Sequence, residues 1–494
     1  MFLRFRTRIA VAIAFAVPLV VLLATVRTSV GFWDTGDLQT VAWIAGIPYP
    51  TGFPLYVVAG WVWTHAIPLG SVAARLNALS AVAVAGGAAA VCAIAISCDV
   101  AAVLAVLAGW TFAFSAPVWL RATYADVHPV GFAVAFVAIV FAVRWVKNGR
   151  TRDIVAAIVA AAVAVGVDNT TVLILAGAVV IVLERRPALR TVALATLAGV
   201  VVVVAAYAYL PLRSAHVTAA RVDPTLALGL PPGRPFWDDH HPSSLDGFIS
   251  LVGGTAFSPD AALRSTMSPH GLAAAAARYA PMLGADFPLG LAIAGPAGLA
   301  LRARRRPLLA LGLTLAGAVP AIFGSTYRVE ADPERYAFAL YAVCAIGIAL
   351  AAGEVIDLFH GRGRAVAQAA LAFVLLAVLA EDVARSGPLF SYRDDPLAVA
   401  WGDEVTRLTR DDAIVVAPWL SATPLAYRAY VEHRFGTRIL VCGWAGDYTA
   451  EYPRWARMRQ LVIASDYVPA VTGHQLRLLS AGSPGLPALF EVVP

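Results

Sequence analysis

Apolar runs recur along most of this chain, and each is close to the roughly 20 residues that a helix needs to cross the hydrocarbon core of a bilayer. Composition agrees with this pattern, because 60% of the 494 residues are hydrophobic and only 14% are charged. Soluble domains carry considerably more charge. The sequence therefore predicts a polytopic α-helical membrane protein.

The net charge of +6 reports membrane orientation rather than a polyanionic partner. The basic residues cluster in short connections between apolar runs, where they mark the cytoplasmic side. No stretch combines a basic face with stacking aromatics, so nucleic acid is not an expected partner. The four cysteines form no CxxC pair, which argues against a disulfide framework or a zinc site.

Basic clusters fix the expected topology. They begin at Arg4, Arg144, Glu184, Arg302 and His360, and each marks a cytoplasmic connection. The first apolar run follows the cluster at Arg4, and we expect it to be retained as a signal anchor. The N-terminus is then cytoplasmic. High Ala, Val and Arg usage suggests a bacterium of high GC content, and the expected location is its inner membrane.

The number of membrane crossings between Gly31 and Arg121, even or odd, decides which segments span the membrane there; we call this the parity argument. Both residues are expected outside, so an even number of crossings separates them. Three apolar stretches lie there, at 53–69, 73–97 and 100–117. The first of these begins near a proline and is rich in tryptophan, a composition that favours the membrane interface. Residues 38–69 are therefore expected to form helices on the outer membrane surface.

The remaining apolar runs complete a topology of about eleven crossings. After the initial anchor and the two later stretches named above, the expected spans are 127–146, 153–167, 170–184, 187–211, 286–302, 307–325, 335–356 and 365–381. This number of crossings places the C-terminus outside the cytoplasm.

Composition also divides the chain into two expected domains. Residues 1–382 form the membrane domain, with large outer loops at 31–72 and 213–285. After residue 383, short apolar runs alternate with helix-like stretches, a pattern that favours an α/β domain. Residues 383–494 are therefore expected to form a small soluble extracytoplasmic domain.

Two acids follow the first span, in the stretch GFWDTGDLQT. Asp34 and Asp37 are three residues apart, so on a helical turn they share one face. One carboxylate could take a proton from an acceptor hydroxyl while the other orients it or binds a cation. The alternative is a helix N-cap or a solvated pair in a loop. No cofactor is required by the sequence, although a divalent cation is compatible with it.

Other polar residues also sit at the expected outer ends of spans. Arg121 and Arg213 are candidates to bind a lipid phosphate through bidentate contacts, the alternative being interface anchoring. Asp126 could cap the next helix, and His128 could carry a proton. Further candidates for contact with substrate are Tyr49, Asn169, Trp237, His241 and Arg328.

The distribution of these residues separates two classes of function. A transporter or flippase of a lipid-linked sugar should place ionisable groups near the membrane midplane. The centres of the apolar runs carry almost no charge here, and the polar residues gather at one membrane face. That pattern favours an enzyme whose substrate lies in the bilayer and reacts at its surface. A non-catalytic sensor or scaffold with the same fold is the third alternative.

Several motifs, in order, resemble a known family. They are DTGDLQTVAWIAGIPYPTGFPLY, SVAARLNALSA, ATYADVHPVGF, YAYLPLRSA and YRVEADPERYAFALYAV. Together they are similar to a bacterial membrane family of unknown function, in which D-S-G-E precedes H-P-P-G-x-P-L-Y and an R-x-N-L-x-S segment. A eukaryotic relative of that family is a transmembrane protein O-mannosyltransferase. The resemblance covers about the first 355 residues and is more specific than any single motif.

The resemblance implies the C-type glycosyltransferase (GT-C) superfold and a polyprenyl-phosphate sugar as donor. Asp34 and Asp37 match the family's first acids, Asp126 matches its second, and Arg213 matches its arginine after Y-L-P-L. The chain departs from the family by an aspartate at 37 in place of glutamate and by Tyr49 in place of histidine. These departures leave the sugar and the acceptor open.

The expected function is that of an inverting glycosyltransferase. It would move a hexose, with mannose as the candidate, from the polyprenyl-phosphate donor to a protein, glycan or lipid acceptor outside the cytoplasm. Asp34 would activate the acceptor, Asp37 would orient it or act as an alternate base, and Arg213 and Arg121 would hold the departing lipid phosphate.

Overall fold

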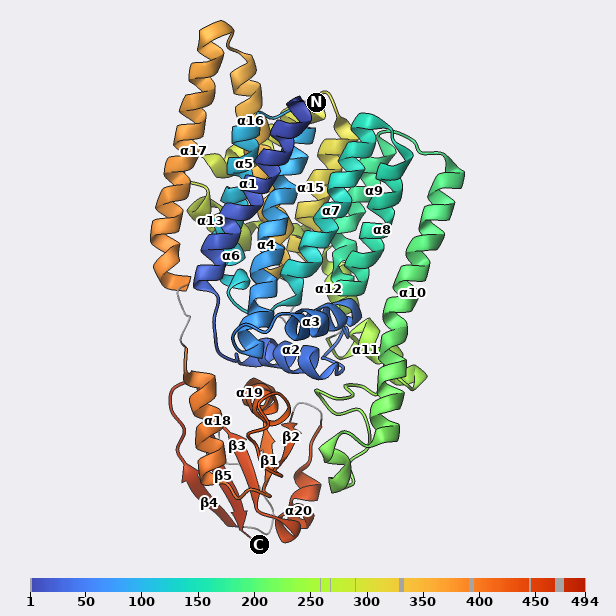
Figure 1. Ribbon diagram of the computed structural model, residues 1–494, viewed down its shortest axis with the longest axis vertical. Coiled ribbons are helices and arrows are strands. Elements are labelled where there is room, and N and C mark those ends of the chain that lie inside the picture. The colour runs from blue at the N-terminus through green and yellow to red at the C-terminus, as the bar shows by residue number, and fades with distance from the viewer. Residues whose placement is uncertain are drawn as a thin grey trace.

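The computed structural model consists of a helical bundle and a smaller α/β domain at one end of it (Figure 1). It describes residues 2–257, 259–266, 268–288, 290–327, 333–390, 395–443, 446–466 and 475–493. The bundle contains α1 (Phe2–Thr25), α4 (Val72–Ser97), α5 (Ala102–Phe114), α6 (Ala116–Ala122), α7 (Val127–Asn148), α8 (Thr151–Val167), α9 (Val172–Leu183), α10 (Leu189–Ala220), α13 (Pro269–Asp286), α14 (Leu291–Ala303), α15 (Pro307–Thr326), α16 (Phe338–Asp357) and α17 (Gly361–Phe390).

The polytopic helical class is confirmed, whereas the number of crossings stays a prediction. Among the described residues, seven helices are long and apolar enough to span a membrane, and nine segments are if the bent pairs α5–α6 and α13–α14 each count as one. The other two expected spans correspond to α8 and α9. They stand upright in the bundle (Figure 1) but have only 17 and 12 residues, short of the roughly 20 that a perpendicular span needs.

Two helices lie crosswise at the end of the bundle that faces the α/β domain. Figure 1 shows α2 (Trp33–Ile44) and α3 (Pro54–Ala66) roughly perpendicular to α4. A proline in the first turn of α3 suits a helix start, where its missing amide proton has no partner to lose. The rings of Trp43 and His65 stack at 4.1 Å and hold the two helices together. This is the arrangement that parity predicts for residues 38–69, except that the first helix begins at Trp33.

Glycines let the bundle helices approach closely. A Cβ atom at Gly298 of α14 would collide with the carbonyl oxygen of Gly347 in α16, and one at Gly177 of α9 would collide with that of Gly312 in α15. Small residues at such contacts are the usual means of packing helices in a membrane, where apolar burial gives little drive.

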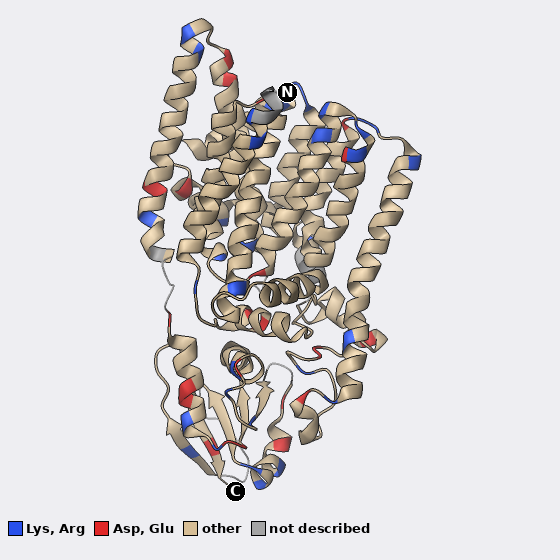
Figure 2. Ribbon diagram, viewed as in Figure 1, with Lys and Arg blue, Asp and Glu red and all other residues tan. Residues whose placement is uncertain are grey.

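Basic residues gather at the end of the bundle where the N-terminus lies (Figure 2). Ion pairs tie the connections there: Lys147 Nζ lies 2.6 Å from the Asp99 carboxylate, and Arg305 lies 3.0 Å from Glu354. The crosswise helices and the α/β domain lie at the opposite end.

The chain between α10 and α13 is not an open loop. The expected outer loop begins at 213, but α10 continues to Ala220. Four short helices follow in this region: η2 (Pro224–Leu228), α11 (Leu245–Gly253), η3 (Thr255–Phe257) and α12 (Pro259–Thr266). Helix η2 contacts β2 of the α/β domain, whereas α12 packs against α13 and α15 of the bundle (Figure 1).

The α/β domain contains a five-stranded mixed sheet in the order β2-β1-β3-β5-β4. Its strands are β1 (Ile414–Ala417), β2 (Ile439–Cys442), β3 (Leu461–Ser465), β4 (Gln475–Ser480) and β5 (Ala488–Val493), and its helices are α18 (Leu397–Leu408), α19 (Trp419–Tyr430) and α20 (Tyr452–Met458). Strands β1, β2 and β3 are parallel, and β5 is antiparallel to β3 and β4.

Burial explains why the three parallel strands read as continuous apolar runs. Every residue of β1, β2 and β3 is buried, because α19 covers one face of the sheet and α20 the other. The expected α/β domain is therefore present. The boundary expected at 383 falls inside α17, which continues to Phe390.

Candidate active site

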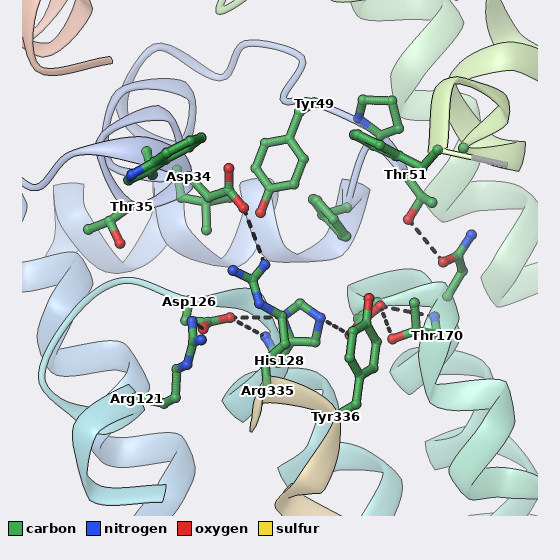
Figure 3. A pocket seen from close by; sticks show the side chains of 18 of the residues that line it. Asp34, Thr35, Tyr49, Thr51, Arg121, Asp126, His128, Thr170, Arg335 and Tyr336 are labelled. Carbon is green, nitrogen blue, oxygen red and sulfur yellow. Dashed lines mark hydrogen bonds and ion pairs between the residues drawn. The ribbon is translucent and has the colours of Figure 1, made fainter. Parts of the chain in front are cut away.

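A cavity of about 880 Å³ lies where the bundle, the crosswise helices and the α/β domain meet. Its walls come from α2, the segment that links α2 to α3, the ends of α6 and α7, η1 (Asn169–Thr171), the end of α11, η4 (Pro333–Ala337) and the start of α19. Its ionisable lining residues are Arg27, Asp34, Arg121, Asp126, His128, Asp168 and Arg335. Figure 3 shows several of these side chains converging on one space.

Asp34 lies in the first turn of α2 and faces this cavity. One carboxylate oxygen accepts a hydrogen bond from Trp419 Nε1 at 3.0 Å, and the other accepts one from Arg335 at 3.2 Å. The two donors come from η4 and α19, so Asp34 connects the crosswise helix to both the bundle and the α/β domain. Each carboxylate oxygen can accept a second hydrogen bond, and the side chain is 29% exposed. It can therefore also contact a ligand.

Asp126 is the centre of a buried polar network below Asp34. Its carboxylate accepts hydrogen bonds from Arg121 at 3.0 Å and from the backbone amide of His128 at 2.9 Å, and its Oδ1 lies 2.9 Å from His128 Nδ1. Burial alone would raise the pKa of Asp126, but His128, Arg121 and Arg335 outweigh it and lower that pKa below its usual range. Asp126 therefore remains a carboxylate that positions its cationic neighbours.

The expected capping role of Asp126 is also present. It is the N-cap residue of α7 and accepts the amide of His128. On the other side of His128, Nε2 lies 4.0 Å from the Asp168 carboxylate. The chain Arg121–Asp126–His128–Asp168 thus crosses the floor of the cavity.

Two further predicted residues line the same cavity. Tyr49 contacts Trp419 edge-on, with ring centroids 5.9 Å apart. Asn169 accepts a hydrogen bond from Thr51 at 3.0 Å and donates one to the carbonyl of Val252, which links η1 to the segment between α2 and α3 and to α11.

The remaining wall of the cavity is apolar. Its members are Leu173, Val172, Phe257, Leu263, Phe323 and Tyr327. The cavity thus combines three arginines and three aspartates with a set of apolar side chains, so it can hold a ligand with a polar head and a hydrocarbon tail.

Asp37 does not line this cavity. It is completely buried, and neither carboxylate oxygen has a hydrogen-bond partner among the described residues. Burial raises the pKa of Asp37 well above its usual range, and the charges of Asp239 and Asp34 add to this rise. The backbone amide of Tyr49 lies near the Asp37 carboxylate and lowers this pKa slightly, but it does not reach hydrogen-bond geometry. The structure thus separates the two acids that the spacing D-x-x-D predicts to act together.

Arg213 lies apart from the cavity lining as well. Its Nε donates to the carbonyl of Ala45 at 2.6 Å and its terminal nitrogen to that of Ile44 at 3.0 Å. These are carbonyls at the C-terminal end of α2, which have no partner within the helix. In this structure Arg213 holds the end of α2.

Trp237 and His241 belong to a second polar cluster, behind α2. The ring of Trp237 contacts Tyr430 of α19 at 5.3 Å. His241 Nδ1 lies 2.8 Å from the Asp238 carboxylate, and His240 pairs with Asp239 at 2.7 Å. Arg328 lies outside the described residues. Nowhere in the described parts of the chain do three acidic, histidine or cysteine side chains form a group that could hold a metal ion.

Sequence reasoning missed two residues that contact Asp34. Arg335 follows Glu334 at the start of a predicted span, so the argument that selected Arg121 at a span end applies to it as well. Trp419 directly follows an apolar strand in the α/β domain and carried no signal. Both contacts join residues that are more than 300 positions apart.

Comparison with known proteins supports this fold. Residues 34–191 match the family model of the protein O-mannosyl-transferase TMEM260 N-terminal domain. The chain is similar to ArnT from Cupriavidus metallidurans in its crystal structure bound to undecaprenyl phosphate, with 13% identity, a TM-score of 0.55 and coverage of 97% of each chain. It is also similar to the Archaeoglobus fulgidus oligosaccharyltransferase in complex with Zn and sulfate, with 15% identity, a TM-score of 0.53 and coverage of 91% of this chain and 68% of that one.

No curated protein matches the chain in sequence. The resemblance drawn from the sequence motifs is nevertheless confirmed, because the family model covers the first motifs and the two solved structures share the architecture. The chain is therefore a multi-pass membrane protein that shares its fold with ArnT and with the oligosaccharyltransferase, and its residues 34–191 match the O-mannosyl-transferase family model.

Proposed function

We propose that the protein is an inverting glycosyltransferase that moves a hexose from a polyprenyl-phosphate donor to an acceptor hydroxyl outside the cytoplasm. The observation that carries this proposal is the position of Asp34, a partly exposed carboxylate held by Arg335 and Trp419 in a cavity that combines charged groups with apolar side chains. Mannose is the first sugar to test, because the family model that matches is that of an O-mannosyltransferase domain.

Asp34 is the base in this scheme. An acceptor hydroxyl hydrogen-bonds to a free lone pair of its carboxylate, and the hydroxyl oxygen attacks the anomeric carbon of the donor. The proton passes to Asp34 as the new C–O bond forms and the bond between the anomeric carbon and the phosphate oxygen breaks. The polyprenyl phosphate departs as an anion and needs no strong acid. Attack from the side opposite the phosphate inverts the anomeric centre.

Three arginines of the cavity supply the charge that the departing phosphate requires. Arg335, Arg121 and Arg27 line the cavity on the side of Asp34 and Asp126. A guanidinium matches a phosphate through two parallel hydrogen bonds. Arg335 contacts Asp34 through one nitrogen at 3.2 Å, and a phosphate that binds Arg335 would weaken that contact and leave Asp34 more available to the acceptor. The apolar wall would hold the start of the polyprenyl chain. The ArnT structure that matches is bound to undecaprenyl phosphate, a lipid of this type.

Orientation in the membrane follows from the distribution of basic residues. They gather at the N-terminal end of the bundle (Figure 2), and cytoplasmic connections carry an excess of Lys and Arg. The cavity and the α/β domain then lie outside the cytoplasm, in the inner membrane of a bacterium. The alternative of a flippase is less well supported, because each long helix has an 18-residue window with at most two charged residues, and the polar network lies at one end of the bundle.

A transfer assay tests the proposal. Purified protein in detergent would be incubated with a panel of radiolabelled polyprenyl-phosphate sugars. Wild type would be compared with Asp34→Asn, which keeps the shape of the side chain but removes the base. Loss of a general base should reduce turnover by about 10²–10⁴-fold, with an unchanged unfolding temperature as evidence of an intact fold. Turnover in Asp34→Asn equal to that of wild type would refute this role, and a donor that binds but stays intact in both would favour transport or sensing.

A further inference from the structure

A second cavity, of about 520 Å³, lies in the α/β domain. The ends of β1 and β3 form two of its sides, at residues 416–419 and 463–466, and the segment after β2 forms the third. This volume falls within the range of small-molecule sites in proteins, roughly 300–1,000 Å³. We call it the crevice below.

The strand order explains why a crevice opens at this place. The chain passes from β1 through α19 to β2 on one side, and then through α20 to β3 on the other side of β1. The strand order therefore reverses beside β1, with α19 on one face of the sheet and α20 on the other. In open α/β sheets, ligands bind at such a switch point, outside the carboxyl ends of the strands.

The described lining of the crevice combines acids, hydroxyls and aromatic rings. Its polar and aromatic members are Asp447, Asp466, Thr449, Ser465, Tyr448, Tyr452 and Trp419. No lysine, arginine or histidine is among the described lining residues. Two carboxylates without a cation disfavour a phosphate or another anion. Carboxylates and hydroxyls can instead hydrogen-bond the hydroxyls of a neutral sugar, and the half-buried ring of Tyr452 can pack on its C–H face.

Contacts within the crevice hold these groups in place. Asp447 accepts the backbone amide of Thr449 at 2.9 Å, a turn that orients its exposed carboxylate. Tyr448 is buried, and its hydroxyl accepts a hydrogen bond from Arg234 at 2.8 Å while the guanidinium lies 5.5 Å from the ring centroid. These contacts orient Asp447 and Tyr448, and the nearby Arg234 already interacts with Tyr448.

Trp419 connects the crevice to the catalytic cavity. It lines both cavities, and its Nε1 donates to Asp34. The ring of Trp419 stacks on that of Phe236, in the segment between η2 and α11, with ring centroids 5.9 Å apart. This contact helps to fix the position of Trp419. A molecule bound in the crevice therefore lies against the same side chain that positions the proposed base.

We propose that the crevice binds a neutral carbohydrate portion of the acceptor, so that the acceptor is a glycan or a glycosylated molecule. This inference rests on the proposed function and adds the chemical class of the acceptor. A cationic polypeptide is the competing occupant, since the two acids would attract it as well, but the half-buried ring of Tyr452 at a strand-end crevice favours a sugar.

Binding of simple saccharides to the full-length protein tests the proposal. Saturation-transfer NMR in detergent would use methyl α-mannoside, methyl α-glucoside, methyl α-galactoside and mannobiose as probes. We expect wild type to bind at least one of them and Asp466→Ala to weaken that binding by tenfold or more. Glu432→Gln, which changes an exposed acid of the same domain away from the crevice, should bind as wild type does.

The outcomes separate this inference from the proposed function. Asp34→Asn should still bind the saccharide, so binding without sugar transfer by wild type would refute the proposed chemistry and retain the crevice as a carbohydrate site. Absence of binding by wild type across the panel, or equal binding by Asp466→Ala, would overturn the inference. The inference would also be overturned, in favour of a cationic polypeptide, if a lysine-rich peptide binds wild type, loses this binding in Asp466→Ala, and displaces no bound saccharide from wild type.

Discussion

Replacing Asp37 with asparagine should stabilise the protein at neutral pH and leave its stability unchanged in acid. Asp37 is completely buried, its carboxylate has no hydrogen-bond partner among the described residues, and burial raises its pKa well above the usual range. Below about pH 4, near the ordinary carboxyl pKa, the folded and unfolded states both hold the proton, so ionisation of Asp37 no longer changes the free energy of unfolding. The amide of asparagine fills the same space and does not ionise.

The sign and size of the effect follow from proton linkage. As the pH rises above about 4, the unfolded chain releases the Asp37 proton while the folded chain retains it, so the free energy of unfolding falls by about 1.36 kcal/mol per pH unit until the raised pKa is reached. Three units, from about pH 4 to pH 7, set an upper limit of about 4 kcal/mol. Asp37→Asn removes this loss, so its advantage over wild type should grow with pH up to that limit.

Thermal unfolding in detergent measures this difference. Asp37→Asn and wild type would be compared at pH 4.5, 5.5, 6.5 and 7.5, and the variant should unfold at a temperature higher by on the order of 5 °C at neutral pH and by little at the lowest pH. Asp246→Asn, which replaces an exposed acid of α11, should show no difference that grows with pH. A difference for Asp37→Asn that is constant with pH, or a loss of stability at pH 7.5, would refute the reasoning.

Three other substitutions test the roles of residues around the cavity. Arg213→Ala should lower the free energy of unfolding by about 1–3 kcal/mol, because it removes both hydrogen bonds to the end of α2; a large rise in donor KM in transfer assays would instead return Arg213 to the donor site. Asp126→Ala should cost about 3–5 kcal/mol by chemical denaturation, since it deprives the buried Arg121 of this carboxylate; a stable variant would show that the network is dispensable. Trp419→Phe should lower turnover by about tenfold with folding intact, the effect of losing roughly one charged hydrogen bond, and unchanged kinetics would show that its bond to Asp34 is not used.

The positions of the crosswise helices were predictable because they depend on local properties. Run length, tryptophan content and the basic clusters are all read within short windows, and parity joins them into a topology. The use of short sequence windows also explains why the number of membrane crossings could not be predicted firmly. Helices α8 and α9 are apolar but short, and whether they cross depends on tilt and on their neighbours rather than on their own sequence.

The members of the cavity were only partly predictable. Asp34, Arg121, Asp126 and His128 converge as their positions at span ends suggest. Helical spacing, however, could not distinguish Asp34 from Asp37. The two residues are three positions apart and share a helix face, yet Asp34 lines the cavity and Asp37 is buried. The burial of each side chain depends on which distant segment packs against its turn of the helix.

The contacts between the α/β domain and the cavity could not be predicted from the sequence either, because they join distant segments. Trp419 and Asp34 are 385 positions apart, and no periodicity within either segment encodes their meeting. Arg335 is 301 positions from Asp34. A search for arginines at every expected span end would have included it, but its partner would have stayed unknown.

Helix α10 is longer than a membrane span and extends toward the α/β domain. This helix has 32 residues and is therefore about 48 Å long at 1.5 Å per residue, whereas the hydrocarbon core is only about 30 Å thick. It continues beyond the bundle toward the α/β domain (Figure 1), and Arg454 of α20 donates to the carbonyl of Leu228 in η2, the short helix that follows α10. This length brings η2, which follows α10, against β2 of the α/β domain. The domain is therefore attached to the rest of the protein at two places, through η2 and through the contact of α19 with α2.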